Sequence, residues 1–354
     1  MEPSVRHRLA QSLTAVENRH GNWRDVLAES YGSPHHATII GVTGPPGSGK
    51  STLIDALAAH WAEQGMTVGV LAIDPSSPFS GGAILGDRLR MRRSEDLGNV
   101  FIRSMSARGH GGGLNAAALD LCTVMAAHGC SLVLLEAVGS GQSEVDIGFV
   151  ADCTVVVAVP GLGDSVQAAK AGLMEIGDLY VVNKSDLPQA GSVQQDLAAM
   201  LAISFHGKPG RNDPATAAPP RPAGVMPQVL SERYGDPDKG EAYWHPPVLA
   251  AACGRAELIA GLARAIDGFT QWLRSSNRLQ KRRRQAFTSH VLAIVKDRLF
   301  GDWARGIEKT LGRPPEQWAG AQLAQDVTDP YRLADRLTDR AESEEPLAKH
   351  GRSQ

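Results

Sequence analysis

The amino-acid sequence predicts an α/β fold: a doubly wound, mostly parallel sheet with helical extensions at both ends of the chain. Short runs of β-branched and aliphatic residues alternate with helical stretches, which is typical of such a sheet. The chain has 354 residues, of which 42% are hydrophobic, enough for one large core. A glycine-rich turn, "GVTGPPGSGKSTL" at residues 41–53, joins the first apolar run to a helix.

The N-terminal extension is assigned to residues 1–36. Residues 4–31 are expected to form one or two amphipathic helices, because Leu9, Leu13 and Val16 recur at helical spacing.

The core domain is expected over residues 37–268. Strands are expected at residues 37–44, 67–74, 131–139, 153–161, 179–186 and 246–254, with a helix at residues 51–65. Ligands bind such sheets beyond the carboxyl ends of the strands, and the motifs described below all lie there.

Two segments differ from this core in composition. Residues 205–245 include a stretch rich in proline, glycine and alanine, which predicts a flexible insertion. Residues 269–354 are expected to form a charged helical segment. Its basic run, "NRLQKRRRQAF" at residues 277–287, favours a solvated helix face.

Composition also limits the partners and the compartment. The formal net charge of −2 gives no general case for nucleic-acid binding. The sequence contains no run of about 18 apolar residues, so no membrane span is predicted. The N-terminus has no apolar signal region, so we expect a cytoplasmic protein. Buried, reduced thiols are expected at Cys122, Cys130, Cys153 and Cys253.

The run from Gly44 to Ser51 is a full Walker A match, which predicts a P-loop NTPase. Its glycines let backbone N–H groups surround a phosphate, and the following helix adds its dipole. Lys50 is expected to reach the β- and γ-phosphates, and the Ser51 hydroxyl to ligate Mg²⁺. The expected phosphate-binding residues are Gly44, Pro45, Gly47, Ser48, Gly49, Lys50, Ser51 and Thr52.

The motif Asn183-Lys184-x-Asp186, at the end of a later strand, predicts which nucleotide base is bound. A carboxylate there accepts hydrogen bonds from N1–H and the 2-amino group of guanine, which adenine lacks, so GTP is favoured over ATP. Asn183 is expected to tie the base edge to the loop, and Lys184 to lie along the ring. Ala252 and Cys253 lie where a supporting backbone contact to the base is expected.

Acids at strand ends and in a nearby loop predict a metal site. Glu136-x-x-Gly139 occupies the place where many GTPases have Asp-x-x-Gly, so the glycine N–H is expected to meet the γ-phosphate. A helix cap at Asp74 and an ordinary loop acid at Asp87 remain the simpler alternatives. The expected Mg²⁺ ligands are Ser51, Asp74, Asp87 and Glu136, and the expected catalytic residues are Lys50, Asp74 and Glu136.

Four further runs carry a resemblance to a known family. The runs "AIDPSSPFSGGAILGDRLRM", "FIRSMSARGHGGGL", "GSGQSE" and "VPGLGDSVQAAKAGLMEIGD", taken with the motifs above, resemble the MeaB/ArgK family. These are P-loop G-protein chaperones of adenosylcobalamin-dependent acyl-CoA mutases. The resemblance is close over residues 5–205 and weak in the C-terminal segment.

The resemblance implies functions for matching positions. It assigns Lys50, Ser51 and Thr52 to the phosphate loop, Asp74, Asp87 and Glu136 to the metal, and Asn183, Lys184 and Asp186 to guanine. It implies that residues 161–170 form a switch that relays the nucleotide state to the mutase. It further implies a homodimer involving the C-terminal helices, slow intrinsic GTP hydrolysis, and gating of cofactor delivery to the mutase.

The sequence also departs from the family pattern. Ala137 replaces the usual threonine after Glu136, which is expected to slow hydrolysis or loosen a switch. The client is left open among methylmalonyl-, isobutyryl-, ethylmalonyl- and 2-hydroxyisobutyryl-CoA mutases. The alternative functions are a metallocentre maturation GTPase of the nickel-insertion type, a kinase, and a GTP-binding scaffold with negligible turnover.

Overall fold

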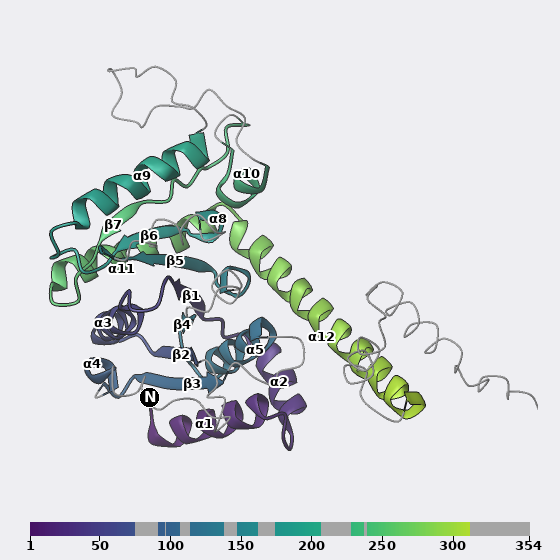
Figure 1. The fold of residues 1–354 in the computed structure, drawn as a ribbon. Helices are drawn as coiled ribbons and strands as arrows, with labels where there is room; N and C mark the ends of the chain where they lie inside the picture. The colour runs from purple at the N-terminus through teal and green to yellow at the C-terminus, as the bar shows by residue number, and fades with distance from the viewer. Residues whose placement is uncertain are drawn as a thin grey trace, which may run out of the picture. The chain divides into compact units, whose positions relative to one another are not determined.

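A computed structural model describes residues 1–74, 91–95, 97–106, 114–137, 147–161, 174–206, 228–236 and 239–311. The chain divides into two compact units, one ending at His290 and the other beginning at Val291. The first unit contains a parallel sheet with helices on both faces, so the predicted α/β fold is confirmed (Figure 1).

The described part of the sheet has seven strands in the order β3-β2-β4-β1-β5-β6-β7, and every neighbouring pair is parallel. The strands are β1 (Thr38–Thr43), β2 (Val68–Asp74), β3 (Val100–Ser106), β4 (Leu132–Glu136), β5 (Cys153–Ala158), β6 (Leu179–Val182) and β7 (Val248–Ala250). Because β1 lies at the centre, the turn that follows it opens at the middle of the carboxyl edge.

The helices connect these strands and extend the chain at both ends. They are α1 (Pro3–Glu17), α2 (Trp23–Tyr31), α3 (Lys50–Glu63), α4 (Arg92–Glu95), α5 (Leu114–Ala127), α8 (Met174–Ile176), α9 (Ala190–His206), α10 (Gln228–Tyr234), α11 (Ala256–Ser275) and α12 (Arg278–Leu311). Among the described residues, no helix has the length and apolar character needed to cross a membrane.

Two apolar layers hold the helices against the sheet. Neighbouring strand residues point to opposite faces, so Leu134 of β4 packs in one layer and Leu135 in the other. The layer around Leu134 includes α3 and α11, and the layer around Leu135 includes α1, α5 and α9. Burial on both faces explains why the strands read as nearly continuous apolar runs.

The N-terminal extension forms two helices, within the expectation from periodicity. Leu9 and Leu13 of α1 are fully buried and Val16 is nearly so. These side chains pack in the same apolar layer as α5, so the extension is part of the first unit.

Strand β3, at the edge of the described sheet, was not expected from the sequence. This strand pairs in parallel with β2 from Val68↔Val100 to Asp74↔Ser106. Arg103 interrupts its apolar pattern and forms an ion pair with Glu17 of α1. An edge strand tolerates such a polar position because it is covered on fewer sides than a central strand.

The predicted insertion at residues 205–245 contains ordered structure where it is described. Helix α10 ends at Tyr234, which is fully buried and whose hydroxyl donates to the Gly177 carbonyl oxygen at 2.8 Å. Composition alone gave no indication of this helix. The proposed domain boundaries remain predictions.

The cysteines are free thiols, as expected for reduced residues. Cys122, Cys130 and Cys153 are buried, and Cys253 is partly buried. Burial raises the pKa of Cys130 to about 12, so this thiol stays neutral at physiological pH.

The predicted solvated face of the basic run is wrong for Arg282 and Arg283. Arg282 donates to both carboxylate oxygens of Asp178 at 2.9 and 3.0 Å. Arg283 donates to both carboxylate oxygens of Asp152 at 2.9 and 2.7 Å. Both aspartates are buried, so these arginines balance charges that water does not solvate. A charge run in a single sequence does not reveal buried partners more than a hundred residues away.

Asp178 is held ionised by more than one cation. Burial acts to raise its pKa, but Arg233 and Arg282 outweigh burial and lower the pKa below its ordinary value. The same carboxylate accepts a hydrogen bond from the Thr154 backbone N–H at 2.8 Å. Asp178 therefore links α10 and α12 to the beginning of β5.

The second unit begins within α12 and is described to Leu311. Among its described residues, exposed apolar side chains recur along the helix at Val291, Leu292, Val295, Leu299 and Phe300. Exposed apolar side chains at this spacing are typical of a helix that packs against another surface.

We expect Arg282→Met to lower the free energy of unfolding by about 3 kcal/mol, because buried Asp178 loses one of its two cations. Urea denaturation at pH 7 measures the change. The pKa of Asp178 is lower in the folded than in the unfolded protein. The stabilising contribution of ionised Asp178 is therefore present above the unfolded pKa of about 3.9 and is lost as the pH falls. The difference in unfolding free energy between the wild type and Arg282→Met should therefore become smaller in acid.

Lys281→Met is the matched control on the same helix. The Lys281 ammonium lies 3.9 Å from Glu232 and both side chains are about half exposed, so the change should stay below about 0.5 kcal/mol. Equal losses in the two variants would contradict the buried pairing.

Candidate functional site

The candidate site begins where β1 ends and the chain turns into α3. The expected phosphate loop lies in this turn, from Gly44 to Gly49, and α3 begins at Lys50. Gly49 precedes the helix with a positive φ of 84° and provides no side-chain cap for its N–H groups. Unpaired N–H groups at a helix N-terminus favour bound anions, so the local geometry suits a phosphate.

Lys50 lies across this loop and is almost fully buried. Its ammonium donates to the carbonyl oxygens of Gly44 at 2.8 Å and Pro45 at 3.0 Å. The side chain therefore folds back over the loop, which places its charge at the loop's centre. The next residues along α3 are buried Ser51 and exposed Thr52.

Ser51 and Glu136 form a buried pair beside the phosphate loop. The Ser51 hydroxyl donates to Glu136 Oε1 at 2.7 Å. The strand register explains this contact, because Glu136 at the end of β4 pairs with Val42 of β1. Two of the four expected metal ligands therefore meet at one place.

The other expected metal residues are described only in part. Asp74 ends β2, which pairs with β4 so that Ala72 lies opposite Glu136. Its backbone therefore reaches the same edge of the sheet, but its side chain lies outside the described part. Asp87 and Gly139 also lie outside the described residues.

The loop after β6 carries the expected guanine motif and contacts the phosphate loop directly. The Asn183 amide donates to the Ser48 carbonyl oxygen at 2.8 Å, and the Lys184 ammonium donates to the Gly47 carbonyl oxygen at 3.1 Å. Asn183 is buried. Its amide N–H₂ carries two donors and one of them contacts the loop, so the expected contact of Asn183 with the base edge stays a prediction.

Asp186 is exposed, so its carboxylate is accessible to a ligand. The loop after β7 supports this region: the Ser185 backbone N–H donates to the Ala251 carbonyl oxygen at 3.0 Å. Ala252 and Cys253 follow in that loop. Burial raises the pKa of Cys253, with Asp186 among the nearby charges, so the thiol lies near the guanine motif in a neutral state.

Three residues that the sequence analysis missed brace the site. Buried Asp55 of α3 accepts hydrogen bonds from the Arg93 backbone N–H at 3.2 Å, and from the Ser94 N–H at 2.9 Å and hydroxyl at 2.6 Å. The Arg93 guanidinium donates to the Cys253 carbonyl oxygen at 3.1 Å. An acid on the otherwise apolar face "TLIDALAA" was the available signal, because a buried carboxylate requires partners.

Ala137 lies directly after Glu136 and is almost fully buried in the apolar layer with α5. Its backbone N–H donates to the Val42 carbonyl oxygen at 3.1 Å. The methyl group therefore serves packing. The expected effect of the missing threonine hydroxyl on hydrolysis stays a prediction.

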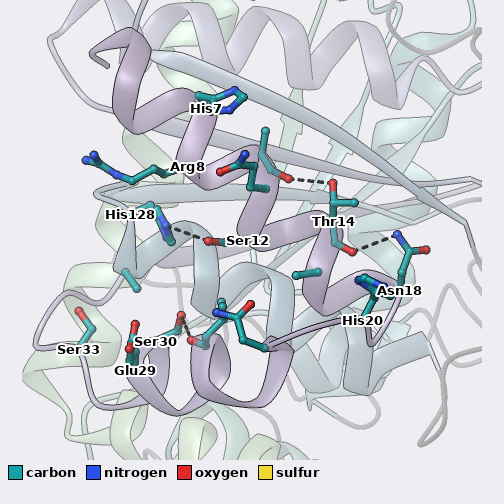
Figure 2. A pocket seen from close by; sticks show the side chains of 16 residues that line it. His7, Arg8, Ser12, Thr14, Asn18, His20, Glu29, Ser30, Ser33 and His128 are labelled. Carbon is teal, nitrogen blue, oxygen red and sulfur yellow. Dashed lines mark hydrogen bonds between the residues drawn. The ribbon is translucent and has the colours of Figure 1, made fainter.

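A large cavity among the described residues of the first unit lies away from these loops. It is a groove of about 1350 Å³ between α1, α2 and the end of α5 (Figure 2). Much of its polar lining is engaged within the fold, in hydrogen bonds from Thr14 to Ala10, Asn18 to Thr14 and Ser30 to Val26, and between Ser12 and His128. No residue of the phosphate loop or guanine motif lines it.

Comparison with known families identifies this arrangement. The family model for methylmalonyl-CoA mutase-associated GTPase MeaB matches residues 9–306. The chain belongs to the MeaB family. The predicted family and the predicted P-loop GTPase class are therefore confirmed.

Curated relatives agree with this assignment. A putative GTPase of Pyrococcus abyssi is 37% identical over 337 residues, which cover 95% of this chain and 93% of the relative. GTPase ArgK of Escherichia coli is 34% identical over 281 residues, covering 78% of this chain and 76% of ArgK.

The crystal structure of a LAO/AO transport system kinase has the same fold. It aligns with a TM-score of 0.63 and 23% sequence identity, covering 95% of this chain and 93% of that chain.

We expect Gly49→Ala to destabilise the protein more than Gly47→Ala. Both glycines have positive φ, so alanine costs about 1–2 kcal/mol of backbone strain at either position. At Gly49 the added Cβ would also lie 2.6 Å from the Asn183 amide nitrogen, whereas at Gly47 it meets no atom within 4 Å.

Thermal unfolding of the nucleotide-free variants measures this difference, since about 1 kcal/mol shifts the Tm of a domain of this size by about 2–4 °C. Equal Tm values would show that the contact between Gly49 and Asn183 does not constrain the loop.

Proposed function

We propose that the protein is a Mg²⁺-dependent GTPase that acts as a nucleotide-controlled chaperone of an adenosylcobalamin-dependent acyl-CoA mutase. The observation that carries the proposal is the contact between two loops. Asn183 holds the Ser48 carbonyl oxygen, and Lys184 holds the Gly47 carbonyl oxygen. Because the guanine motif is fixed to the phosphate loop, one nucleotide spans both.

The base is recognised by Asp186, whose exposed carboxylate accepts hydrogen bonds from guanine N1–H and the 2-amino group. Lys184 lies along the ring through its aliphatic stem. The backbone at Ala252 and Cys253 supports the base, and Arg93 holds that backbone by its contact with the Cys253 carbonyl oxygen.

The phosphates bind the loop before α3. Lys50 exchanges its carbonyl partners at Gly44 and Pro45 for phosphate oxygens, and backbone N–H groups of the loop complete the cradle. We assign this binding to Gly44, Pro45, Gly47, Ser48, Gly49, Lys50, Ser51 and Thr52, and the γ-phosphate contact to Gly139.

The oxygens of Ser51 and Glu136 fit a magnesium ion. They meet in a buried pair next to the phosphate loop, and Mg²⁺ prefers carboxylate, hydroxyl, water and phosphate oxygens. We propose that Asp74 and Asp87 complete the protein ligands. When bound, the ion neutralises charge that develops on the transferring phosphoryl group.

The chain contributes to hydrolysis by positioning and electrostatics. Lys50 and the loop N–H groups stabilise negative charge on the γ-phosphoryl group as water attacks in line with the leaving oxygen. Buried Glu136 orients Ser51, which keeps the first turn of α3 ready for the phosphates. Asp74 and Glu136 are proposed to act with Lys50 in this step.

The family supports a mutase as the partner, because its description names an association with methylmalonyl-CoA mutase. We further propose a cytoplasmic homodimer that pairs through the second unit. The exposed apolar residues from Val291 to Phe300 support this pairing, since burying them from water favours association.

Two alternatives lead to different measurements. A scaffold that binds GTP with negligible turnover would hydrolyse GTP no faster than its Lys50→Ala variant. A metallocentre maturation GTPase would bind nickel tightly and stoichiometrically. The family match favours the mutase chaperone over the nickel type.

We expect Asp186→Asn to weaken GTP binding about 100-fold and to strengthen binding of xanthosine triphosphate, because the asparagine amide donates to the 2-oxo group of xanthine. Titration calorimetry with both nucleotides measures the exchange of preference. Asp186 is exposed, so the Tm of the variant should remain that of the wild type. Unchanged GTP affinity would refute the assignment of the base.

We expect the protein to bind one of the four candidate mutase types with an affinity that differs about tenfold between GDP and a non-hydrolysable GTP analogue. Binding is measured by interferometry with purified mutases. The Lys50→Ala variant should lose this dependence, because it no longer holds the phosphates. Absence of binding to every mutase, or equal binding with both nucleotides, would refute the chaperone function.

A further inference from the structure

A second cavity, of about 330 Å³, lies at the amino edge of the sheet. It is formed by the end of α2, the beginning of β1, part of α5, the residues before β5 and the first turns of α12. All its lining residues precede His290 and belong to the first unit. Since β1 begins beside this cavity and ends at the phosphate loop, the two sites lie at opposite ends of one strand.

The inner part of this cavity is apolar. Ile39, Leu119, Cys122, Ala126 and Val150 line it, and most of them are buried or nearly so in the layer around α5. Burying the apolar body of a ligand against such a surface removes apolar area from water, which favours binding.

Aromatic rings form one wall. Tyr31 and Phe287 pack edge to face with ring centroids 5.9 Å apart, and both line the cavity. Tyr31 is fixed further by donating its hydroxyl to Asp120 at 2.9 Å. Phe287 remains 50% exposed, so one face of this wall is accessible.

The charges around the cavity are predominantly positive. Among the described residues that line it, the cationic or titratable bases are Arg282, Arg283, Arg284, His35 and His36, and the acid is Asp152. Asp152 is already paired with Arg283 through both carboxylate oxygens. Arg282 is balanced by Asp178, which also pairs with Arg233.

Of the three described arginines that line the cavity, Arg284 is the one without a carboxylate partner. Its Nε donates to the Gln280 carbonyl oxygen at 3.3 Å, a contact within its own helix. Its two terminal nitrogens have no ion-pair or hydrogen-bond partner in the described part of the chain. A guanidinium in this state forms strong hydrogen bonds with an entering carboxylate, sulfonate or phosphate.

We propose that this cavity binds a small amphipathic anion, whose apolar body lies on the inner surface beside Tyr31 and Phe287 and whose acidic head pairs with Arg284. A volume of about 330 Å³ is near the lower end of the range for small-molecule sites. The ligand is therefore a short acyl chain or a compact ring system with one anionic group. The site is separate from the nucleotide site.

The test uses a matched pair of fluorescent probes. 8-Anilinonaphthalene-1-sulfonate carries an apolar body and a sulfonate, and N-phenyl-1-naphthylamine is the same body without the sulfonate. We expect the full-length protein to bind one sulfonate probe per chain, about tenfold more tightly than the neutral probe. Equal affinity for the two probes would overturn the anionic character of the site.

Two substitutions on α12 test the charge. Arg284→Gln should lower the affinity for the sulfonate probe about tenfold and leave the neutral probe unchanged, while Arg284→Lys should keep most of the affinity. Lys281→Gln is the matched control, because Lys281 lies on the same helix but does not line the cavity. An equal loss in Lys281→Gln would show a general charge effect and refute the role of Arg284.

Two further substitutions test the location. Ala286→Trp fills the cavity and should abolish the stoichiometric binding, whereas Gln285→Trp, outside the cavity, should not. If Leu299→Ser in the second unit removes the signal and Ala286→Trp does not, the probe binds the exposed apolar residues of the second unit and the proposal fails. Lys50→Ala should bind the probe normally, which distinguishes this site from the proposed GTPase function.

Discussion

The hydrogen-bond register of β1 with its neighbours is the constraint on which the functional edge depends. Pairing of Val42 with Glu136 places that carboxylate next to the end of β1, where it reaches Ser51. On the other side, β5 lies between β1 and β6 and places Asn183 against the loop after β1. A shift by one residue would turn each of these side chains to the wrong face. The apolar cores on both faces, with Leu134 and Leu135 as an example, fix that register.

The sequence predicted the central elements well because they are governed by local rules. A buried parallel strand reads as an apolar run, and a Walker A motif combines strand, turn and helix in a few residues. The edge strand β3 was missed since Arg103 breaks its pattern and its ion pair with Glu17 arises only in the folded chain. Propensity and periodicity carry no information about such distant partners.

The residues of the candidate site also fall into two groups, those that a sequence motif predicts and those that only the folded structure reveals. Lys50, Ser51, Glu136 and Asn183 follow from motifs whose spacing is set by phosphate and base geometry. Asp55 belongs to no such motif, and its importance appears only once α4 and the loop after β7 are seen around it. The arginines of α12 were expected to face solvent because a charge run is usually exposed. In the structure, Arg282 and Arg283 instead pair with buried aspartates.

The buried pairs of Asp152 and Asp178 with α12 also determine which part of the chain can fold by itself. A fragment that stops at the end of α11 would contain the whole sheet and both nucleotide loops, yet it would leave Asp152 without its arginine and Asp178 with one of two. Such a fragment would have to hydrate or protonate carboxylates in its interior, which favours swelling and aggregation. The smallest autonomous nucleotide-binding piece is therefore expected to include the first turns of α12, although no residue proposed to bind the nucleotide lies in that helix.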